Sequence, residues 1–498
     1  MDLIHQHQLK VNWMHYVKSL SSLFIVIIFS ASVFAGDIYV GTATADITPK
    51  LPVALMGQFH LRIATEAETP LLANIIAVES RDGNNSDYSI FVACDLVIIS
   101  DQLLIQARET IKKRLPAVDV NKIIITATHT HTCPVTDTVL MNYPIPKEGV
   151  SQIQDYLDLF AARVSDAVVK AWENRKPGIV TWGLSHAVVG YNRRSVYADG
   201  RAVMYGATEI PEFRGMEGPE DHDVNILFFW NKMGKLIGTT VTVPCPSQEV
   251  ENRNAINADY WHDVRLDLKK RFGNDLVVVG WCGAAGDQSP HVRYRQRGDE
   301  RMHKLANRTR TQEIARRIGV AVQEAYDVVK TDRYDNLPVV HKYEKLQLPM
   351  RAVTEAERLD AVRNRDRAAA AIAADPSKVN ELQGEKNWYG STVALAEKQK
   401  ANPALFHPTE IHAIRIGDIV ICTNPFELFV DYSIQMQARS KAVQTFVVQL
   451  AGSGGYLPTQ KAKDAGGYSA VVQSTPVGPE GGMILVDKTV DLINSLWP

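Results

Sequence analysis

Two histidines separated by one residue, His129 and His131, stand directly after a short apolar run. That run, residues 123–127 with the sequence Ile-Ile-Ile-Thr-Ala, predicts a buried β-strand. Residues two positions apart in an extended backbone point to the same face, so we expect both imidazoles to leave the strand end side by side. The carboxyl ends of strands in helix-flanked sheets open onto binding crevices. The pair therefore indicates a metal or ligand site, although two hydrogen-bonded polar residues would give the same pattern.

A second candidate follows the apolar run 277–280, where small residues lead to Asp287 and Ser289. Small residues let successive backbone amides converge on an oxyanion, and Ser289 would lie beside them as a nucleophile or a hydrogen-bond donor. A tight turn capped by Asp287 is the structural alternative. Both residues are candidate catalytic residues.

Two further segments contain side chains that suit a metal. Cys245 lies between two prolines, and His262 opens a predicted helix. Thiolate sulfur and imidazole nitrogen are both zinc ligands, but a packed cysteine and a surface histidine are the simpler alternatives. Glu427 is expected in the first turn of a helix over 426–439, where the helix dipole alone would favour a carboxylate.

The elements that must position these residues alternate along the chain. Strands are predicted at 38–46, 73–79, 88–94, 179–183, 276–281, 411–416 and 419–422, and helices at 103–115, 150–174, 261–271 and 311–329. This alternation predicts an α/β fold with layers of helices on a largely buried sheet. Residues 354–400, rich in Ala, Arg, Glu and Lys, predict a helical excursion with a solvated charged face.

The charge balance excludes some classes of partner. The 498 residues include 54 basic and 56 acidic side chains, for a formal net charge of −2. Nothing in this balance favours nucleic acid or an anionic membrane surface. Five cysteines, an odd number spread along the chain, make a poor disulfide framework.

The N-terminus has the order of a secretory signal peptide. Two lysines precede an apolar run over 20–34, and Val33 and Ala35 are the small residues of a cleavage site. A retained anchor would need about 20 apolar residues without interruption, and this run is shorter and contains serines. We therefore expect a signal peptide over 1–35, cleavage near Ala35, and an exported, periplasmic or secreted domain over 36–498 without a transmembrane segment.

In their order and spacing, these segments resemble the catalytic domain of the neutral (non-lysosomal) ceramidase family. The resemblance extends over some 430 residues, and no single motif carries it. Its landmarks are Gly41-Thr-Ala-Thr-Ala-Asp46-Ile-Thr-Pro49, Thr128-His-Thr-His131-Thr-x-Pro134, Asn192-Arg193-Arg194, Gly286-Asp287-Gln288-Ser289-Pro290, Pro425-x-Glu427, and Gly455-Tyr456-x-Pro-Thr459 with Tyr468 twelve residues after Tyr456.

The resemblance implies a layered helix–sheet hydrolase fold and a zinc amidase site. In that site His129, Glu427 and Tyr456 would be zinc ligands. Where ceramidases proper carry a second histidine ligand, this chain has Cys245. The metal would accept this thiolate, recruit His262, or be bound differently.

The remaining roles also follow from the resemblance. His131 would be the acid/base that assists the leaving group, Tyr468 would polarise the scissile carbonyl, and Ser289 matches a serine associated with catalysis. Whether Ser289 attacks or only donates a hydrogen bond stays open. The segment that contacts substrate in the family matches Asn192, Arg193 and Arg194.

We therefore expect an exported zinc-dependent hydrolase that cleaves an N-acyl amide, or an ester by the same geometry. The chain ends about 30 residues after Tyr468, so we expect no C-terminal immunoglobulin-like domain like that of ceramidases proper. We expect the substrate to be a ceramide-like lipid or an N-acylated sugar, and the oligomeric state is left open. The alternative is a metal-free, non-catalytic protein that holds a polar, glycan-like ligand with Arg193, Arg194 and His60.

Overall fold

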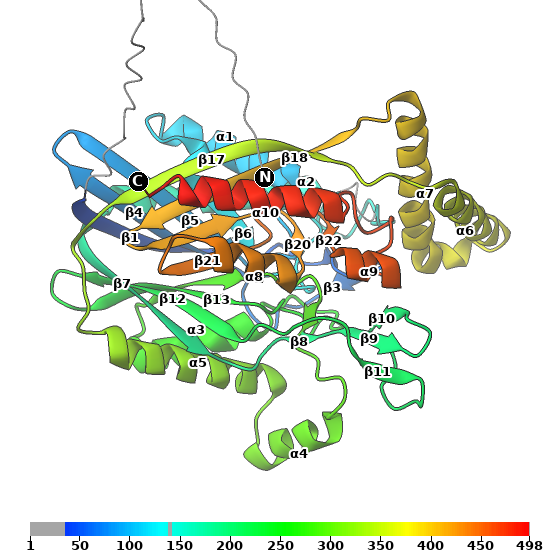
Figure 1. The fold of residues 1–498 in the computed structure, drawn as a ribbon, viewed down its shortest axis with the longest axis horizontal. Coiled ribbons are helices and arrows are strands. Elements are labelled where there is room, and N and C mark those ends of the chain that lie inside the picture. The colour runs from blue at the N-terminus through cyan, green and yellow to red at the C-terminus, as the bar shows by residue number, and fades with distance from the viewer. Residues whose placement is uncertain (1–34, 138–141, 498) are drawn as a thin grey trace, which may run out of the picture. The chain divides into compact units, whose positions relative to one another are not determined.

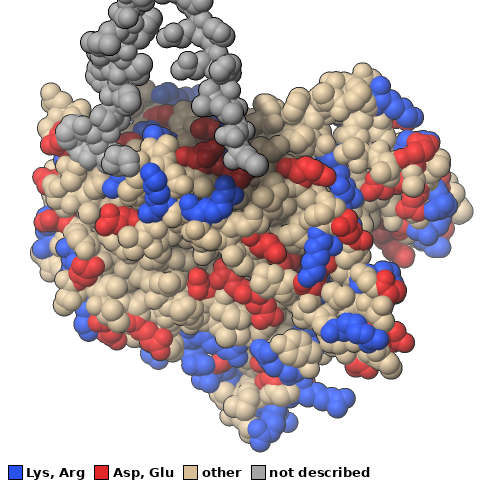
Figure 2. All heavy atoms as spheres, viewed as in Figure 1, with Lys and Arg blue, Asp and Glu red and all other residues tan. Residues whose placement is uncertain are grey.

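The structure is a computed structural model that describes residues 35–137 and 142–497. The predicted signal peptide over 1–35 lies, apart from Ala35, outside the described residues. In the part that is described, no helix is both long and apolar enough to cross a membrane. Figure 2 shows basic and acidic side chains interspersed on the face in view, as the near-zero net charge predicts.

A large mixed sheet forms the centre of the fold. Its order within the described residues is β14 (Val277–Cys282), β13 (Leu236–Val243), β12 (Asp223–Asn231), β7 (Lys176–His186), β1 (Gly36–Asp46), β4 (Leu72–Asp82), β5 (Asn85–Cys94) and β6 (Ile123–Ala127), with β16 (Asn336–Leu337) beside β1. The pairs β13·β14 and β5·β6 are parallel, and the other pairs are antiparallel. Strands β4 and β5 are joined by a tight turn at Gly83, whose φ of +57° suits a residue without a side chain.

A smaller sheet packs against one face of the large sheet. It contains β17 (Val339–Pro349), β18 (Phe406–Ile416), β19 (Ile419–Thr423) and β21 (Gln444–Val448). Alternate residues of both sheets, among them Phe91, Trp281, Ile414 and Phe446, form one buried cluster between them. The predicted α/β fold is confirmed, with two stacked sheets at its centre.

Helices cover the outer faces of both sheets (Figure 1). The large sheet is covered by α1 (Asp101–Arg114), α2 (Ile153–Glu173), α3 (Tyr260–Phe272) and α5 (Arg310–Val329), and the small sheet by α8 (Val430–Arg439) and α10 (Pro479–Asn494). The layers therefore run helix, sheet, sheet, helix. Helix α4 (Gln296–Ala306) precedes α5, and α9 (Gln460–Ala465) follows β22 (Tyr456–Leu457).

The helical excursion expected near 354–400 is present as α6 (Glu355–Ala374) and α7 (Val379–Ala401). In Figure 1 this pair stands at one end of the fold, next to α9. Short strands and turns complete the described chain: β2 (Val53–Leu55), β3 (Arg62–Ala64), β8 (Tyr191–Asn192), β9 (Arg194–Tyr197), β10 (Ala202–Met204), β11 (Phe213–Met216), β15 (Gln288–Ser289), β20 (Glu427–Leu428), and the 3-10 turns Val120–Lys122 and Pro376–Lys378.

The helix predicted over 426–439 was placed too early. Glu427 lies in β20, which pairs in parallel with β22, and α8 begins only at Val430. The backbone N–H of Glu427 donates to the Gly455 carbonyl (2.8 Å), so a partner distant in sequence overrides the local helical pattern. The five cysteines are all buried and unpaired.

A buried polar chain ties the two sheets together. The Ser89 hydroxyl on β5 lies 2.8 Å from Nδ1 of His341, whose Nε2 lies 3.0 Å from Nδ1 of His412. The chain ends at Glu410, 3.1 Å from Nε2 of His412. Burial lowers the pKa of both histidines. Although burial alone would raise it, hydrogen bonds from His412 and Arg108 lower the pKa of Glu410 to about 2.

This chain predicts a loss of stability in acid. Groups whose pKa is lower in the folded state stabilise the fold above their unfolded pKa, and that contribution is lost as the pH falls. The histidine contribution should decline below pH about 6.5, and that of Glu410 from pH about 4.5 toward 2. We expect His341→Gln to flatten the dependence of the urea midpoint on pH between 6.5 and 4.5. An unchanged slope would show that the pair does not couple to unfolding.

Candidate active site

The histidine pair is positioned by a turn after β6. The strand ends at Ala127, and His129 has a φ of +72°, in the left-handed region. Its backbone N–H donates to the carbonyl of Leu96 (2.8 Å), which holds the turn in place. The two rings meet as predicted, with their Nε2 atoms 3.3 Å apart, but a strained turn brings them together instead of an extended strand. Such strain in a buried polar residue is typical of a functional site.

The tautomer of His129 follows from its neighbour. Its Nδ1 lies 2.7 Å from the carbonyl oxygen of Val97, which can only accept a hydrogen bond. The proton is therefore on Nδ1, and Nε2 presents a lone pair. Burial lowers the pKa of His129, and burial with the nearby His129 ring lowers that of His131 well below its usual value. Both rings are neutral near pH 7.

The tautomer of His131 is set by Gln248 and Arg193. The Arg193 guanidinium donates to the side-chain oxygen of Gln248 (3.2 Å), so the Gln248 amide nitrogen faces Nε2 of His131 at 2.7 Å and donates to it. The His131 proton is therefore on Nδ1, which faces the Glu251 carboxylate at 3.4 Å. Nε2 of His131 is held as an acceptor.

Glu427 and Tyr456 occupy matching positions on β20 and β22. Burial, followed by the nearby carboxylate of Glu427, raises the pKa of the Tyr456 phenol well above its usual value. Oε2 of Glu427 lies 3.5 Å from Nε2 of His129. The structure thus brings His129, Glu427 and Tyr456 together, although Glu427 follows His129 by 298 residues in the sequence.

The donor set fits a divalent cation. The lone pair of His129 Nε2 faces two acceptors, Nε2 of His131 and the carboxylate of Glu427, with no proton to share among them. Two ligands of one tetrahedral zinc ion lie about 3.4 Å apart, close to the separation of His129 and Glu427. No group of three or more His, Cys, Asp or Glu side chains in the described residues is arranged around a metal position. With His129 and Glu427, the Tyr456 phenol would be the third protein ligand that the family resemblance implies.

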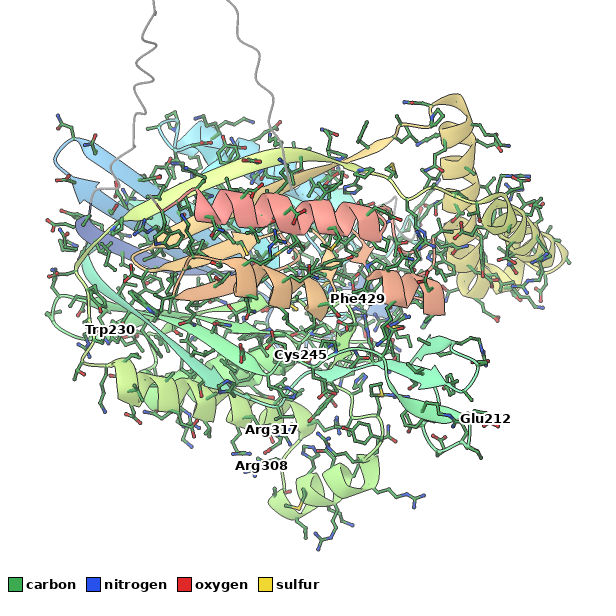
Figure 3. The ribbon with its side chains drawn as sticks, viewed as in Figure 1. Glu212, Trp230, Cys245, Arg308, Arg317 and Phe429 are labelled. Carbon is green, nitrogen blue, oxygen red and sulfur yellow. The ribbon has the colours of Figure 1, made fainter. Side chains whose placement is uncertain are left out.

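Cys245 and His262 lie elsewhere. Cys245 is fully buried in the cluster between β13 and α3, its sulfur lies 3.6 Å from the Pro246 carbonyl oxygen, and burial raises the pKa of its thiol well above the usual value. Figure 3 places it in the interior of the fold. His262 is in the first turn of α3, beside Asp95 and Arg265. Neither is among the described residues that line the cavity around His129.

Behind His131 lies a buried group of carboxylates and imidazole. Glu251 is 3.4 Å from Nδ1 of His131 and 3.8 Å from Nδ1 of His291, and Glu249 is 3.9 Å from the other nitrogen of His291. Burial raises the pKa of both glutamates to about 7 and lowers that of His291 to about 4. Because its carboxyl group faces Nδ1 of His131, Glu251 in its ionised form can stabilise a positive charge that develops on that ring.

Arg193 connects the reaction centre to Ser289. Its guanidinium is fully buried and donates to the Tyr456 phenol (3.1 Å) and toward the Tyr205 phenol (3.5 Å). The Tyr205 hydroxyl donates to Ser289 (3.1 Å), as does the His291 backbone N–H (3.1 Å). Ser289 is therefore linked to Arg193 through the Tyr205 hydroxyl. The described lining of the cavity does not include Ser289.

The expected oxyanion amides have other partners. The Gly286 N–H donates to the carbonyl of Leu428 (2.8 Å), and the Ala285 N–H donates to the side chain of Gln449 (3.1 Å). The backbone amides that were expected to bind an oxyanion instead hold β20 in place. The carboxylate of Asp287 accepts from Asn192 (2.9 Å) and from the N–H of Val430 (3.2 Å), and burial raises its pKa to about 6.

Arg194 and His60 also differ from expectation. Arg194 forms a buried two-point ion pair with Glu217 (2.6 and 3.1 Å) and donates to the hydroxyl of Ser469 (3.0 Å). It positions the segment that carries Tyr468. His60 is exposed, and the described lining of the cavity includes neither His60 nor Arg194.

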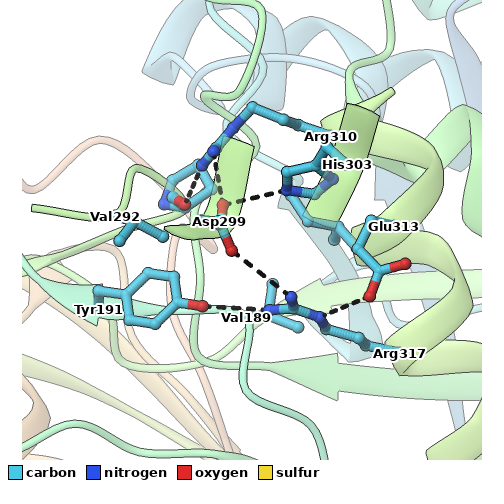
Figure 4. A pocket seen from close by; sticks show the side chains of 10 residues that line it. Val189, Tyr191, Val292, Asp299, His303, Arg310, Glu313 and Arg317 are labelled. Atoms are coloured by element: carbon cyan, nitrogen blue, oxygen red, sulfur yellow. Dashed lines mark hydrogen bonds and ion pairs between the residues drawn. The ribbon is translucent and has the colours of Figure 1, made fainter. Parts of the chain in front are cut away.

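A cavity of about 280 Å³ opens at the histidine pair. Its lining includes the reaction-centre residues together with Tyr468 and Trp388, and is completed by Met56, Gly57, Val97, Ile98, Ser391, Pro425, Leu450, Ser453, Gly454, Gly455, Gln473 and Ser474. A second cavity, between α4 and α5, measures only about 10 Å³, room for about one water molecule. Figure 4 shows ion pairs filling it, among them Asp299 with Arg310 and Glu313 with Arg317.

Gly57 fixes the place of the His131 ring. It has a φ of +109°, and a Cβ added there would lie 2.6 Å from Cβ of His131. We expect Gly57→Ala to displace the ring and lower kcat about 10²-fold, since a displacement of about 1 Å costs that much. Thermal unfolding would report any loss of fold. A kcat within twofold of that of the wild type would show that the position of the His131 ring is not critical.

Gln248, Glu251 and Trp388 are site residues that the sequence did not single out. Gln248 and Glu251 follow Cys245 in a loop without a recognisable spacing rule. Trp388 lies in the charged segment 354–400. A large aromatic side chain within that segment was the sequence feature that could have pointed to a role in the site. Its helix forms one wall of the cavity instead of standing wholly in solvent.

Neither a protein-family model nor the sequence of a curated protein matches the chain. Among solved structures, the neutral ceramidase from Pseudomonas aeruginosa is similar with a TM-score of 0.68 and 16% identity, over 93% of this chain and 74% of that chain. A ceramidase complexed with C2 is similar with a TM-score of 0.65 and 15% identity, over 93% of this chain and 75% of that chain. The chain therefore has the fold of the ceramidase catalytic domain, as the sequence resemblance predicted.

Proposed function

We propose that the protein is an exported, zinc-dependent hydrolase that cleaves an N-acyl amide. The observation that carries this proposal is the lone pair of His129 Nε2, buried at the end of a cavity and facing Glu427. A binding protein without metal would leave these electron-rich groups facing one another without compensation. The paired Arg194 and the exposed His60 also give little support to that alternative.

His129, Glu427 and Tyr456 would hold the zinc ion. When bound, zinc lowers the pKa of a coordinated water and polarises a carbonyl. His131, whose Nε2 carries no proton, would take one there from the attacking water, in place of the Gln248 hydrogen bond, and return it to the leaving nitrogen. Glu251 stabilises the imidazolium that forms.

The developing negative charge on the acyl oxygen also needs donors. Tyr468 lines the cavity, and burial raises the pKa of its phenol, so it stays protonated and can donate. The buried Arg193 adds a fixed positive charge beside Tyr456. Ser289 acts through Tyr205 as a positioning residue in this arrangement.

The test is reconstitution of metal-free protein. Protein stripped with a chelator should hydrolyse N-acyl amides only after zinc is added, with activity rising to a plateau at one zinc ion per chain. Equal activity with and without zinc, in the presence of chelator, would contradict the proposal. Size comparison of precursor and exported chain would test cleavage near Ala35.

A further inference from the structure

A row of aromatic rings leads outward from the reaction centre. The ring of Tyr456 lies 5.6 Å from that of Tyr468, which lies 5.9 Å from Trp388, which lies 5.1 Å from Tyr389. Phe59 flanks the row, 5.8 Å from Trp388 and 5.5 Å from Tyr468. Trp388 and Tyr468 are nearly parallel, at 30°. We call these five rings the aromatic track.

Contacts between helix α7 and the segment that contains Phe59 and Leu61 hold the aromatic track in place. The side chain of Asn380 accepts from the backbone N–H of Leu61 (2.8 Å) and donates to the carbonyl of the same residue (3.3 Å). Gly384 packs on the backbone of Phe59 so closely that a Cβ there would lie 2.2 Å from the Phe59 carbonyl oxygen. The rings from two distant segments are therefore held together before any ligand binds.

The rest of the cavity lining is uncharged and contains both apolar and polar side chains. Met56, Val97, Ile98, Pro425 and Leu450 are apolar, whereas the remaining polar side chains are those of Ser391, Ser453, Gln473 and Ser474. Apart from His129, His131 and Glu427, the described lining includes no Asp, Glu, Lys, Arg or His. Such a surface favours an uncharged ligand with one apolar face and a rim of hydroxyl groups.

The size of the cavity favours a compact ligand. Its volume of about 280 Å³ is just below the range of about 300–1,000 Å³ that is typical of ligand pockets. Large apolar side chains that are strongly exposed in the described residues, such as Met233 and Val443, do not line it. A cavity of about 280 Å³ has little room for a lipid with two long chains.

We propose that the aromatic track selects a compact N-acyl amino sugar as substrate, with its pyranose ring stacked on Trp388 and its acyl group at His129. A pyranose presents a flat face of C–H bonds and a rim of hydroxyls, which suits a cavity whose lining combines Trp388 with serine and glutamine side chains. In the reaction, water oxygen bonds to the acyl carbon, the C–N bond breaks, and the nitrogen gains a proton, giving a carboxylic acid and an amino sugar. This inference rests on the proposed function, whose substrate class it narrows.

The test compares two probes with the same acyl group, N-acetylglucosamine and N-acetylsphingosine, on zinc-loaded protein. We expect a higher kcat/KM for the sugar. Trp388→Ala should raise KM for the sugar about tenfold while kcat changes less than about threefold, because stacking is lost but the reaction centre is not. Trp388→Phe should retain most of the affinity. Phe406→Ala, which removes an exposed aromatic ring on β18, is the matched control and should change nothing.

Binding separates this inference from the proposed function. Calorimetry in a His131→Asn background should detect N-acetylglucosamine, and adding Trp388→Ala should weaken that binding about tenfold. Sugar binding that depends on Trp388, without hydrolysis of either probe by the zinc-loaded protein, would support the track and contradict the hydrolase. A higher kcat/KM for N-acetylsphingosine, or sugar affinity unchanged in Trp388→Ala, would overturn the inference while leaving the hydrolase intact.

Discussion

His129→Asn is expected to lower kcat/KM for N-acyl amide hydrolysis by at least about 10³-fold, because loss of a metal ligand removes several kcal/mol of transition-state stabilisation. Asparagine is chosen because it tolerates the left-handed backbone at this position, where φ is +72°. The turn that carries His131 should therefore survive. Single-turnover rates, measured with zinc present, check the effect on chemistry.

The matched control for that variant is His262→Asn. His262 lies on α3 and not in the described cavity lining, so its replacement should leave both rate and zinc content unchanged. A far-UV circular dichroism spectrum identical to wild type would show that both variants fold. If His129→Asn kept a rate within tenfold of wild type, His129 could not be a metal ligand.

Arg265→Ala is expected to lower the free energy of unfolding by about 3–5 kcal/mol, because it leaves the buried Asp95 carboxylate without its partner. The guanidinium of Arg265 contacts both oxygens of Asp95, at 2.6 and 3.2 Å, and the Asp95 side chain is fully buried. The same carboxylate accepts from the N–H of Leu72 (2.8 Å) and the hydroxyl of Thr128 (3.3 Å). Thr128 precedes His129, so this ion pair also supports the turn that carries His129.

Urea denaturation measures this effect, and a double variant isolates it. Asp95→Asn combined with Arg265→Met removes both charges at nearly constant volume and should recover most of the stability. A loss below about 1 kcal/mol in Arg265→Ala would show that the pair behaves like an exposed salt bridge.

Local sequence patterns predicted the positions of helices and strands better than they predicted the contacts between those elements. The apolar run at 123–127 became β6 with the predicted bounds, because a buried strand is encoded by consecutive β-branched residues. Glu427 was assigned to the first turn of a helix over 426–439, but it lies in β20. Its pairing with Tyr456 depends on a segment about 30 residues away, which local periodicity does not encode.

The family resemblance named residues that line the cavity as well as residues, such as Ser289 and Arg194, that the described lining does not include. His129, His131, Glu427, Tyr456 and Tyr468 surround one cavity, as the resemblance implied. The tautomer of His131, in contrast, depends on Gln248 and Arg193, whose side chains meet through folding of distant loops. Side-chain type and the family resemblance both suggested Cys245 as a ligand, but its sulfur is buried in the cluster between β13 and α3.

The most direct test of the account is X-ray absorption at the zinc edge of the reconstituted protein. The account predicts a first shell of nitrogen and oxygen atoms only, at about 2.0–2.2 Å, from His129, Glu427 and Tyr456. A sulfur atom at about 2.3 Å would make Cys245 a ligand and contradict this assignment, as would protein that retains no zinc.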